Sequence, residues 1–406
     1  MSSLQTVGRS SGASVIVAVL LATAVAPLNA TMIVVALPSI GAEFHASLAT
    51  SSLLVTGYLA AMAVLPAMGG RLGDRWKRPT LMFTGLAMLA GAALGASIAP
   101  TLSVLLVCRV AQAAGGAMAF PNALALLREL IPVRHRGLSF GLVGAGMALA
   151  AAAGPPLGQL LLWTGGWRWV FAINLPLVGL AVAAGVVSLR QIADSRDGAA
   201  SAAVPARRTI FWRSPRLAAA TLAMALSNLA LYAALVGIPL LLTAAGEGPE
   251  SGLLLTALLA AAALSATLGG RLADVGGRRI AAVMGLCALA GGLLPIAVAG
   301  QRLGVHAMAA GLVMAGAGLG ASSTAIQVGG MEAVGAAASG AAAGLLATSR
   351  YVGGAAGSGA LPLVMALVPQ EPLNALFAVA VAAALLAAAA GAFLGAGRIT
   401  LSSVGE

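Results

Sequence analysis

The chain has 406 residues, of which 60% are hydrophobic and only 8% are Asp, Glu, Lys or Arg. A soluble globular protein is about 25% charged, so this chain lacks the residues for a hydrated surface. A net charge of +11 could indicate a nucleic-acid partner, but the mean hydropathy of +1.01 favours a lipid bilayer. We therefore expect a membrane protein that crosses the bilayer several times.

Twelve apolar runs follow one another, most of them about as long as the roughly 20 residues that cross a bilayer as a helix. The first is too long for the core of a cleavable signal peptide, so we expect it to remain as a span. Cys108 and Cys287 lie inside runs, where buried apolar residues are a better interpretation than a disulfide or a metal site. The predicted spans are 13–37, 49–70, 80–99, 102–127, 137–162, 169–189, 216–243, 251–271, 280–299, 304–328, 338–367 and 373–397.

The longest polar interruption, 190–215, lies at the midpoint of the chain and is rich in Ala, Ser and Arg. We interpret it as a cytoplasmic linker between an N-terminal half (1–189) and a C-terminal half (216–406), each with six helices. With the N-terminus placed inside, all but four of the 22 basic residues fall in cytoplasmic segments. Positive charge gathers on the cytoplasmic side of membrane proteins, so this bias predicts cytoplasmic termini, a plasma (inner) membrane location and no nucleic-acid partner.

The two halves repeat one another. "GGRLGDRWKRP" begins at Gly69, and the similar "GGRLADVGGRR" begins at Gly269. Each follows the second span of its half. Asn29 and Asn228 also occupy corresponding places in the first span of each half. Two parallel halves with a site between them is a known plan of secondary transporters.

The repeated loop resembles the signature loop of the major facilitator superfamily, Gly-x-Leu-Ala-Asp-Arg-x-Gly-Arg-Arg. The first copy departs from it, because Lys77 replaces a glycine and Pro79 follows Arg78. The resemblance implies a latch that holds the outward-facing state; the alternative is a plain basic turn. The residues that match the latch are Gly70, Asp74, Arg75, Arg78, Gly270, Asp274, Gly277 and Arg278.

Two further motifs lie on the fourth and fifth spans. "RVAQAAGGA", from Arg109, is similar to the family's fourth-helix signature and implies that Arg109 supports coupling to protons; a structural ion-pair or capping role is the alternative. A charged residue is costly within a bilayer, so we expect Arg109 and Arg350 to face the protein interior. "GLVGAGMALAAAAGPPLG" resembles the antiporter signature, with Gly154, Pro155 and Gly158 as packing positions. Alone, it also fits an ordinary glycine-packed helix.

"GGWRWVFAINLP" and "LNATMIVVALPSI" resemble segments of the multidrug proton antiporters. In many of these proteins an aspartate stands where this chain has Asn29. An amide cannot release a proton as a carboxylate can, and none of the acidic residues lies clearly at mid-membrane. Coupling through a buried acid is therefore in question.

Polar residues within the spans are candidates for the central cavity. Each of them could instead serve only to bond one helix to another. Arg350 would make the cavity positive and attract anionic or zwitterionic compounds; the alternative is a hydrogen bond to backbone carbonyls. The candidates are Asn29, Tyr58, Gln112, Asn122, Asn228, Tyr232, Gln327, Arg350 and Tyr351.

These observations predict an all-α membrane protein with twelve transmembrane helices in two six-helix halves, the major facilitator fold. By resemblance, we expect a monomeric exporter of amphipathic organic compounds that exchanges them for protons by alternating access. The alternative is an exporter or facilitator of a neutral or anionic metabolite, without a buried carboxylate for proton coupling. A non-transporting sensor ranks last. Neither an enzyme motif nor a cofactor or metal motif is present in the sequence.

Overall fold

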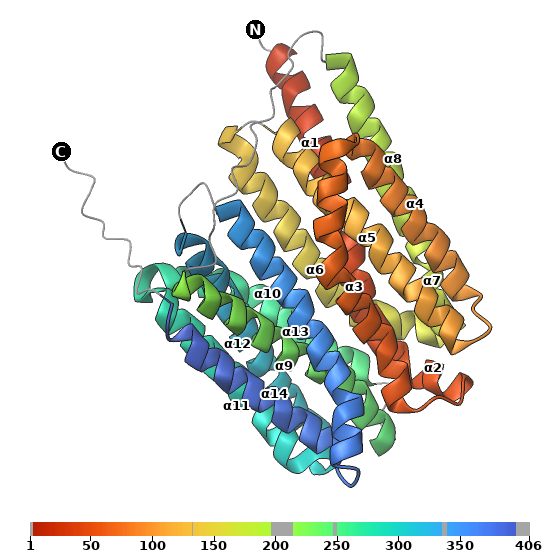
Figure 1. Cartoon of the computed structure of the whole chain (residues 1–406), viewed down its shortest axis with the longest axis vertical. Coiled ribbons are helices and arrows are strands. Elements are labelled where there is room, and N and C mark those ends of the chain that lie inside the picture. Colours follow the sequence, from red (N-terminus) through yellow and green to blue (C-terminus); the bar gives the residue numbers. More distant parts are fainter. Residues whose placement is uncertain (1–2, 132, 196–213, 247–249, 335–338, 395–406) are drawn as a thin grey trace, which may run out of the picture. The chain divides into compact units, whose positions relative to one another are not determined.

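The computed structural model describes residues 3–131, 133–195, 214–246, 250–334 and 339–394. Within these ranges every regular element is a helix (Figure 1). In lipid, a helix satisfies all of its backbone hydrogen bonds internally, which is why apolar runs of this length take that form. The helices coincide with the twelve predicted spans, the first of which is divided into three pieces and the sixth into two.

The N-terminal half contains α1 (Ser3–Met32), the 3₁₀ turn η1 (Ile33–Ala36), α2 (Leu37–Glu43), α3 (Leu48–Arg75), α4 (Arg78–Ser97), α5 (Leu102–Leu130), α6 (Val133–Gly165), α7 (Trp167–Ala172) and α8 (Asn174–Ser195). The C-terminal half contains α9 (Pro215–Ala245), α10 (Ser251–Gly276), α11 (Arg278–Ala299), η3 (Gly300–Arg302), α12 (Val305–Glu332), α13 (Ser339–Leu367) and α14 (Pro372–Gly391). Ten candidate spans in the described residues are long and apolar enough to cross a membrane. The apolar stretch of α10 is shorter, Ser251–Ala266.

The chain divides into two compact units. Unit 1 is Met1–Ser39 with Val64–Ala206, and unit 2 is Ile40–Ala63 with Arg207–Glu406. Ile40–Ala63, with the first part of α3, groups with Arg207–Glu406 in unit 2. The predicted linker, 190–215, lies mostly outside the described residues, since α8 continues to Ser195 and α9 begins at Pro215.

The first part of α3 belongs to unit 2 because its side chains pack against α13. The Thr56 and Ser358 hydroxyls are 3.0 Å apart and share a hydrogen bond. One turn further along α3, Leu59 lies against Gly354, which has no side chain to separate the helices. These contacts join residues about 300 positions apart in the sequence, so the span pattern alone does not predict them.

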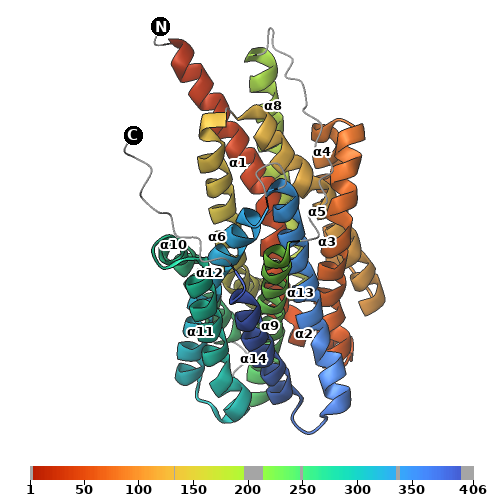
Figure 2. The same cartoon turned by 60° about the vertical axis from the view of Figure 1, so that its left-hand side comes forward.

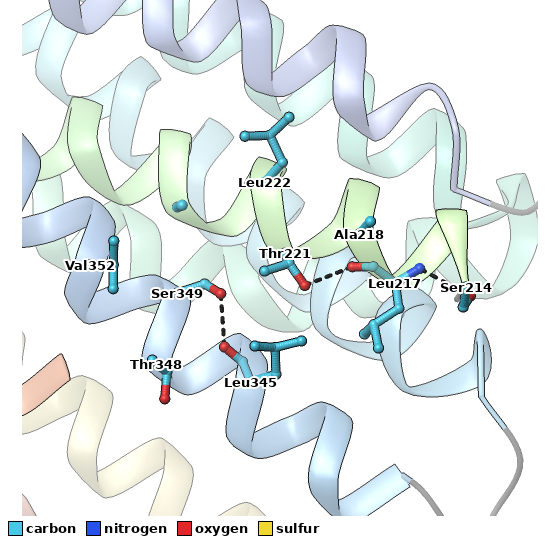
Figure 3. Close-up of a pocket in the computed structure, with 10 residues that line it drawn as sticks. Ser214, Leu217, Ala218, Thr221, Leu222, Leu345, Thr348, Ser349 and Val352 are labelled. Atoms are coloured by element: carbon cyan, nitrogen blue, oxygen red, sulfur yellow. Dashed lines mark hydrogen bonds between the residues drawn. The ribbon is translucent and has the colours of Figure 1, made fainter. Parts of the chain in front are cut away.

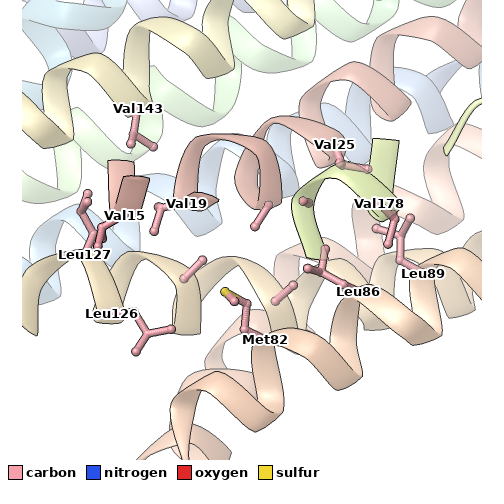
Figure 4. Packing of buried hydrophobic residues seen from close by; sticks show 14 of the residues in the cluster. Val15, Val19, Val25, Met82, Leu86, Leu89, Leu126, Leu127, Val143 and Val178 are labelled. Carbon is pink, nitrogen blue, oxygen red and sulfur yellow. The ribbon is translucent and has the colours of Figure 1, made fainter. Parts of the chain in front are cut away.

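The core of unit 1 is an apolar cluster that joins five helices (Figure 4). Its members are buried alanines and larger aliphatic side chains, mainly from α1, α4, α5, α6 and α8. The larger ones include Val15, Val19, Val25, Met82, Leu86, Leu89, Leu126, Leu127, Ile131, Val143 and Val178. This cluster fixes α1 against α5, which is the pair of helices that carries the polar site described below.

Glycines bring neighbouring helices into backbone contact, and they do so at matching places in the two units. Gly85 of α4 meets Gly115 of α5, and a Cβ on either glycine would overlap backbone atoms of the other helix. In unit 2, Gly285 of α11 meets Gly318 of α12 in the same way. Within unit 2, α11 also packs against α14, and the two run side by side in Figures 1 and 2. Small residues permit this close approach, and dispersion forces then hold the helices together in lipid.

An ion pair joins α4 to α5 and another joins α11 to α12, in each case at the end next to the repeated loop. Arg78 at the start of α4 contacts Glu129 near the end of α5, with 2.9 Å between Nε and Oε1. Arg278 at the start of α11 donates from Nε and Nη2 to the two carboxylate oxygens of Glu332 at the end of α12, at 3.3 and 3.1 Å. Only 8% of the Arg278 side chain is exposed, against 29% for Arg78, so the second pair is the more desolvated.

The two loop copies differ at one position for a reason of backbone geometry. Gly277 caps α11 with φ +91°, a conformation that side chains rarely adopt. Lys77 caps α4 with φ −66° and an extended ψ, so no glycine is needed there. Pro79 then falls in the first turn of α4, where its missing N–H has no helical partner to lose.

A methyl group added at the glycine contact should destabilise the protein. We expect Gly85→Ala to lower the free energy of unfolding by about 1–3 kcal/mol, because the clash is with backbone atoms that cannot rotate away. Gly91→Ala on the same helix is the matched control, since a Cβ there meets no atom within 4 Å. Thermal unfolding of the purified protein measures both. Equal losses in the two variants would contradict the contact.

The ion pairs predict unequal effects in the two units. We expect Arg278→Gln to cost about 1–2 kcal/mol, because it leaves a bidentate pair broken at a desolvated site. Arg78→Gln should cost less than about 1 kcal/mol, as exposed pairs do. The double variant Arg278→Glu with Glu332→Arg exchanges the two charges. Its midpoint of thermal unfolding should recover part of the loss caused by Arg278→Gln. No recovery would mean that Arg278 acts through packing alone.

Candidate functional site

Arg109 of α5 is the largest fully buried side chain of the described residues, with 0% of its surface exposed. Its Nη1 donates a hydrogen bond to Asn29 Oδ1 of α1 at 2.9 Å. The same nitrogen donates to Gln112 Oε1, one turn along α5, at 3.0 Å. Asn29 and Gln112 are likewise 0% exposed. The expectation that Arg109 faces the protein interior is confirmed.

Besides the amides from α1 and α5, the Arg109 site includes an aromatic ring from α7. The guanidinium carbon lies 5.9 Å from the centre of the Phe171 ring on α7, a distance at which a cation is attracted to a ring face. Trp167 packs edge-on against Phe171 with 5.9 Å between ring centres. The predicted sixth span breaks after α7 and resumes in α8. This places the aromatic segment of "GGWRWVFAINLP" beside Arg109.

Glycines on α6 set the position of Asn29. A Cβ on Gly154 would overlap the Thr31 hydroxyl, and one on Gly158 would overlap the Met32 carbonyl oxygen. The Thr31 hydroxyl also donates to the Ala151 carbonyl at 2.9 Å, which ties α1 to α6. Pro155 is buried within α6. The glycines of this motif therefore let α1 pack closely against α6 in the turn that follows Asn29.

The acidic positions of unit 1 on the described helices lie far from Arg109 along the sequence of those helices. Glu129 is twenty residues further along α5, about 30 Å by helix rise. Asp74 follows Gly73, which packs on Asn122, thirteen residues and about 20 Å along the same helix. Asp194 lies near the end of α8, at the opposite end from α7. The oxygen atoms that receive the two Nη1 hydrogen bonds are amide oxygens.

Two hydrogen-bond donors of the cluster have no acceptor among the described residues. They are Asn29 Nδ2 and Gln112 Nε2. Rotating either amide by half a turn would bring its NH2 group, instead of its oxygen, to the guanidinium, so the orientation is fixed by Arg109. Buried donors are normally satisfied, and an unsatisfied one marks a strained or functional place.

In unit 2, Asn228 corresponds to Asn29 in the sequence but has different surroundings. It is 6% exposed and donates to its own helix, to the Met224 carbonyl at 2.9 Å. Arg350 is exposed, with Nη2 3.9 Å from Met224 Sδ. Tyr232 packs against Gly354, and Tyr58 of α3 is buried at 1% exposure. These four residues stand on α9, α13 and the first part of α3.

The remaining candidates are spread over other helices. Asn122 is buried and donates to the Gly69 and Met118 carbonyls, at 3.2 and 2.8 Å, so it joins α5 to α3. Gln327 of α12 is exposed, and Tyr351 of α13 is half-buried. Among the latch residues, Gly70 packs near Pro121, and Gly270 near Thr324. The side chains of Asp74, Arg75 and Asp274 lie outside the described residues.

A groove of about 420 Å³ lies between α9 and α13 within unit 2 (Figure 3). Its lining is mostly apolar and includes four serine or threonine residues, three of which donate to backbone carbonyls. Thr221 donates to the Leu217 carbonyl at 2.7 Å, Ser349 to Leu345 at 2.8 Å and Ser214 to Ala333 at 3.2 Å. Cavities of 300–1,000 Å³ suit small organic ligands. The full lining is Ser214, Leu217, Ala218, Thr221, Leu222, Ala225, Leu345, Thr348, Ser349 and Val352.

Sequence reasoning missed three of these features: the two ion pairs, Phe171 as a wall of the Arg109 site, and the groove. The ion pairs had a usable signal, since Arg78 and Arg278, and Glu129 and Glu332, recur at almost the same spacing. Phe171 and most of the groove residues lie in apolar runs whose composition is similar throughout the chain, so nothing in the sequence singles them out. Only the packing of the helices distinguishes them.

Several named proteins are similar in sequence to part of this chain. It is 33% identical over 186 residues, 46% of its length, to the uncharacterized MFS-type transporter YvkA of Bacillus subtilis. It is 35% identical over 162 residues to the tetracenomycin C resistance and export protein of Streptomyces glaucescens, and equally to a multidrug resistance protein B homolog of Mycobacterium tuberculosis. The matches span 42% of the length of YvkA and 30% of the other two proteins.

A solved structure covers nearly the whole chain. A bacterial homolog of the human lysosomal transporter Spinster, in an inward-facing and occupied conformation, superposes with a TM-score of 0.72 at 18% identity, over 93% of this chain and 95% of that one. The likeness confirms the fold. The family model of the Major Facilitator Superfamily matches residues 19–358. Together with the repeated helix contacts, this match shows that the chain is a multi-pass membrane transporter of the Major Facilitator Superfamily.

Proposed function

We propose that this transporter exports amphipathic organic compounds by alternating access. The observation that carries the proposal is the groove between α9 and α13, which has the volume of a small organic ligand. The hydroxyls of Ser214, Thr221 and Ser349 donate to backbone carbonyls, so the groove offers mainly contact to apolar groups. Export also fits relatives that are named for drug resistance and for export of tetracenomycin C.

For the energy source, proton antiport is the first candidate, because the motifs on α5 and α6 resemble those of proton antiporters. One observation favours a second candidate, a neutral or anionic cargo without proton exchange at a buried carboxylate. The acceptors at Arg109 Nη1 are the amides of Asn29 and Gln112, and neither amide titrates. A positive site of this kind should disfavour organic cations, which need a counter-charge when they leave water.

The topology belongs to the same proposal. The basic loops support cytoplasmic termini and a plasma-membrane location. The paired loops after α3 and α10, with Asp74 and Asp274, would latch the outward-facing state. We take the monomer as the transporting unit, since both halves of the fold are present in one chain.

Filling the groove should slow export. We expect Ala218→Trp, which places an indole in the groove, to reduce efflux of the neutral dye N-phenyl-1-naphthylamine by about tenfold, equivalent to about 1.4 kcal/mol of lost binding. Ala347→Trp is the matched control, because Ala347 is exposed on α13 beside Thr348 but does not line the groove. Efflux from loaded cells with equal protein levels measures both. Unchanged export by Ala218→Trp would remove the groove from the transport path.

A carboxylate at position 29 should change the preferred charge of the cargo. We expect the parent to export N-phenyl-1-naphthylamine faster than the cation ethidium. Asn29→Asp should raise ethidium efflux about tenfold and make it depend on pH, because the new acid can balance a cation or bind a proton. Efflux of both dyes at several pH values measures this. Strong, pH-driven ethidium export by the parent would contradict the reading of Asn29.

A further inference from the structure

We propose that the segment Ile40–Ala63 moves with unit 2 during transport, and that α2 and α3 bend beside Pro38 and Pro66 when it does. The proposal rests on the alternating access proposed above, because that cycle requires the two units to move against one another. The chain leaves unit 1 at Ser39–Ile40 and returns to it at Ala63–Val64. Both passages lie inside helices, so the moving helices must bend there.

The first part of α3 is attached to unit 2. The Thr56 hydroxyl shares a hydrogen bond with the Ser358 hydroxyl of α13, 3.0 Å away. A Cβ on Gly354 of α13 would come within 3.2 Å of Leu59, so the two helices are in close contact. The segment Ile40–Ala63 is therefore held by α13 at two successive turns of α3.

The last part of α3 is attached to unit 1. A Cβ on Gly69 would overlap the Ala117 carbonyl oxygen of α5, and one on Gly73 would overlap the side chain of Asn122. Asn122 also donates from Nδ2 to the Gly69 carbonyl at 3.2 Å. Its two ends thus hold α3 to different units, and any movement of the units must be taken up between Leu59 and Gly69.

Pro66 lies between these two attachments and is half-buried within α3. A proline has no N–H to donate, so the Met62 carbonyl cannot receive the helical hydrogen bond from position 66. The proline ring also crowds the preceding turn, and sharp bends of helices concentrate at prolines. The weakest point of α3 therefore coincides with the stretch that has to bend.

The other passage has the same character. Pro38 stands one residue before Ser39–Ile40 in α2, directly after the 3₁₀ turn η1 (Ile33–Ala36). A 3₁₀ stretch inside a longer helix often marks a hinge, because its hydrogen bonds are poorer than those of an α-helix. The segment Ile40–Ala63 is thus bounded by a proline at each end.

Bending of α3 can be measured in the purified full-length protein with Cys108 and Cys287 replaced by alanine. Spin labels are attached at Leu53→Cys and Met68→Cys, two exposed positions on either side of Pro66. They lie about 22 Å apart by helix rise, within reach of double electron–electron resonance. We expect two distances in the parent, whose proportions change when N-phenyl-1-naphthylamine is added.

A matched pair of labels on α13 is the control. Val352→Cys and Leu367→Cys are both exposed and have the same separation in sequence. They also stand on either side of a proline, Pro362, but α13 lies wholly in unit 2. We expect one distance for this pair, unchanged by the dye, because a single unit holds the whole helix.

Substitutions of Pro66 separate a hinge from a residue that only stabilises the fold. Alanine and glycine both restore the missing N–H, but glycine leaves the helix easier to bend and less stable. We expect Pro66→Ala to unfold at a higher temperature than Pro66→Gly. Efflux of N-phenyl-1-naphthylamine should show the opposite order, falling about tenfold in Pro66→Ala and less than about twofold in Pro66→Gly. Pro362→Ala should export at the parent's rate.

Two results would overturn the proposal. One is a single distance for the α3 labels in the parent, both with and without the dye. The other is efflux by the Pro66 variants that is unchanged or that follows their unfolding temperatures. A parent that exports no dye would instead refute the proposed function, and the label distances would still decide whether α3 bends at Pro66.

Discussion

A guanidinium buried in a membrane protein must be surrounded by oxygen atoms and ring faces, and unit 1 is arranged around that requirement. Arg109 takes its acceptors from α1 and from its own helix, and the Phe171 ring on α7 closes the remaining side. The glycines of α6 let α1 come close enough for Asn29 to reach the guanidinium. The apolar cluster behind α1 and α5 then holds these helices in place.

The units share their means of assembly but differ in their polar chemistry. In both units, two neighbouring helices are joined by a close contact between glycines and by an ion pair at the end next to the repeated loop. Unit 1 places a buried guanidinium beside two amides, whereas unit 2 has a mainly apolar groove in which Thr221 and Ser349 donate to backbone carbonyls. Repetition therefore preserves the packing of the helices and leaves the polar positions free to diverge.

The amide at position 29, in place of an acid, bears on proton exchange. An aspartate next to Arg109 would form a buried ion pair that could be broken by a proton. Asn29 makes a hydrogen bond of the same geometry whose strength does not depend on pH.

The sequence by itself determined the helical fold, the number and order of the spans and the repeat of the two halves. The physical reason is that a bilayer gives backbone groups no partner outside the helix, so an apolar run of sufficient length has one solution. It also identified Arg109, Asn29 and Gln112 as unusual, because polar residues are rare in such runs. Only the tertiary structure decided that these three side chains meet, that Asn228 bonds to its own helix instead, and that the first part of α3 packs with α13. Those outcomes depend on which face each helix turns to its neighbours. This chain is rich in Ala, Gly and Leu, so each helix is almost equally apolar on all sides. The face that a helix packs against its neighbour is therefore decided by how well the side chains of the two helices fit together.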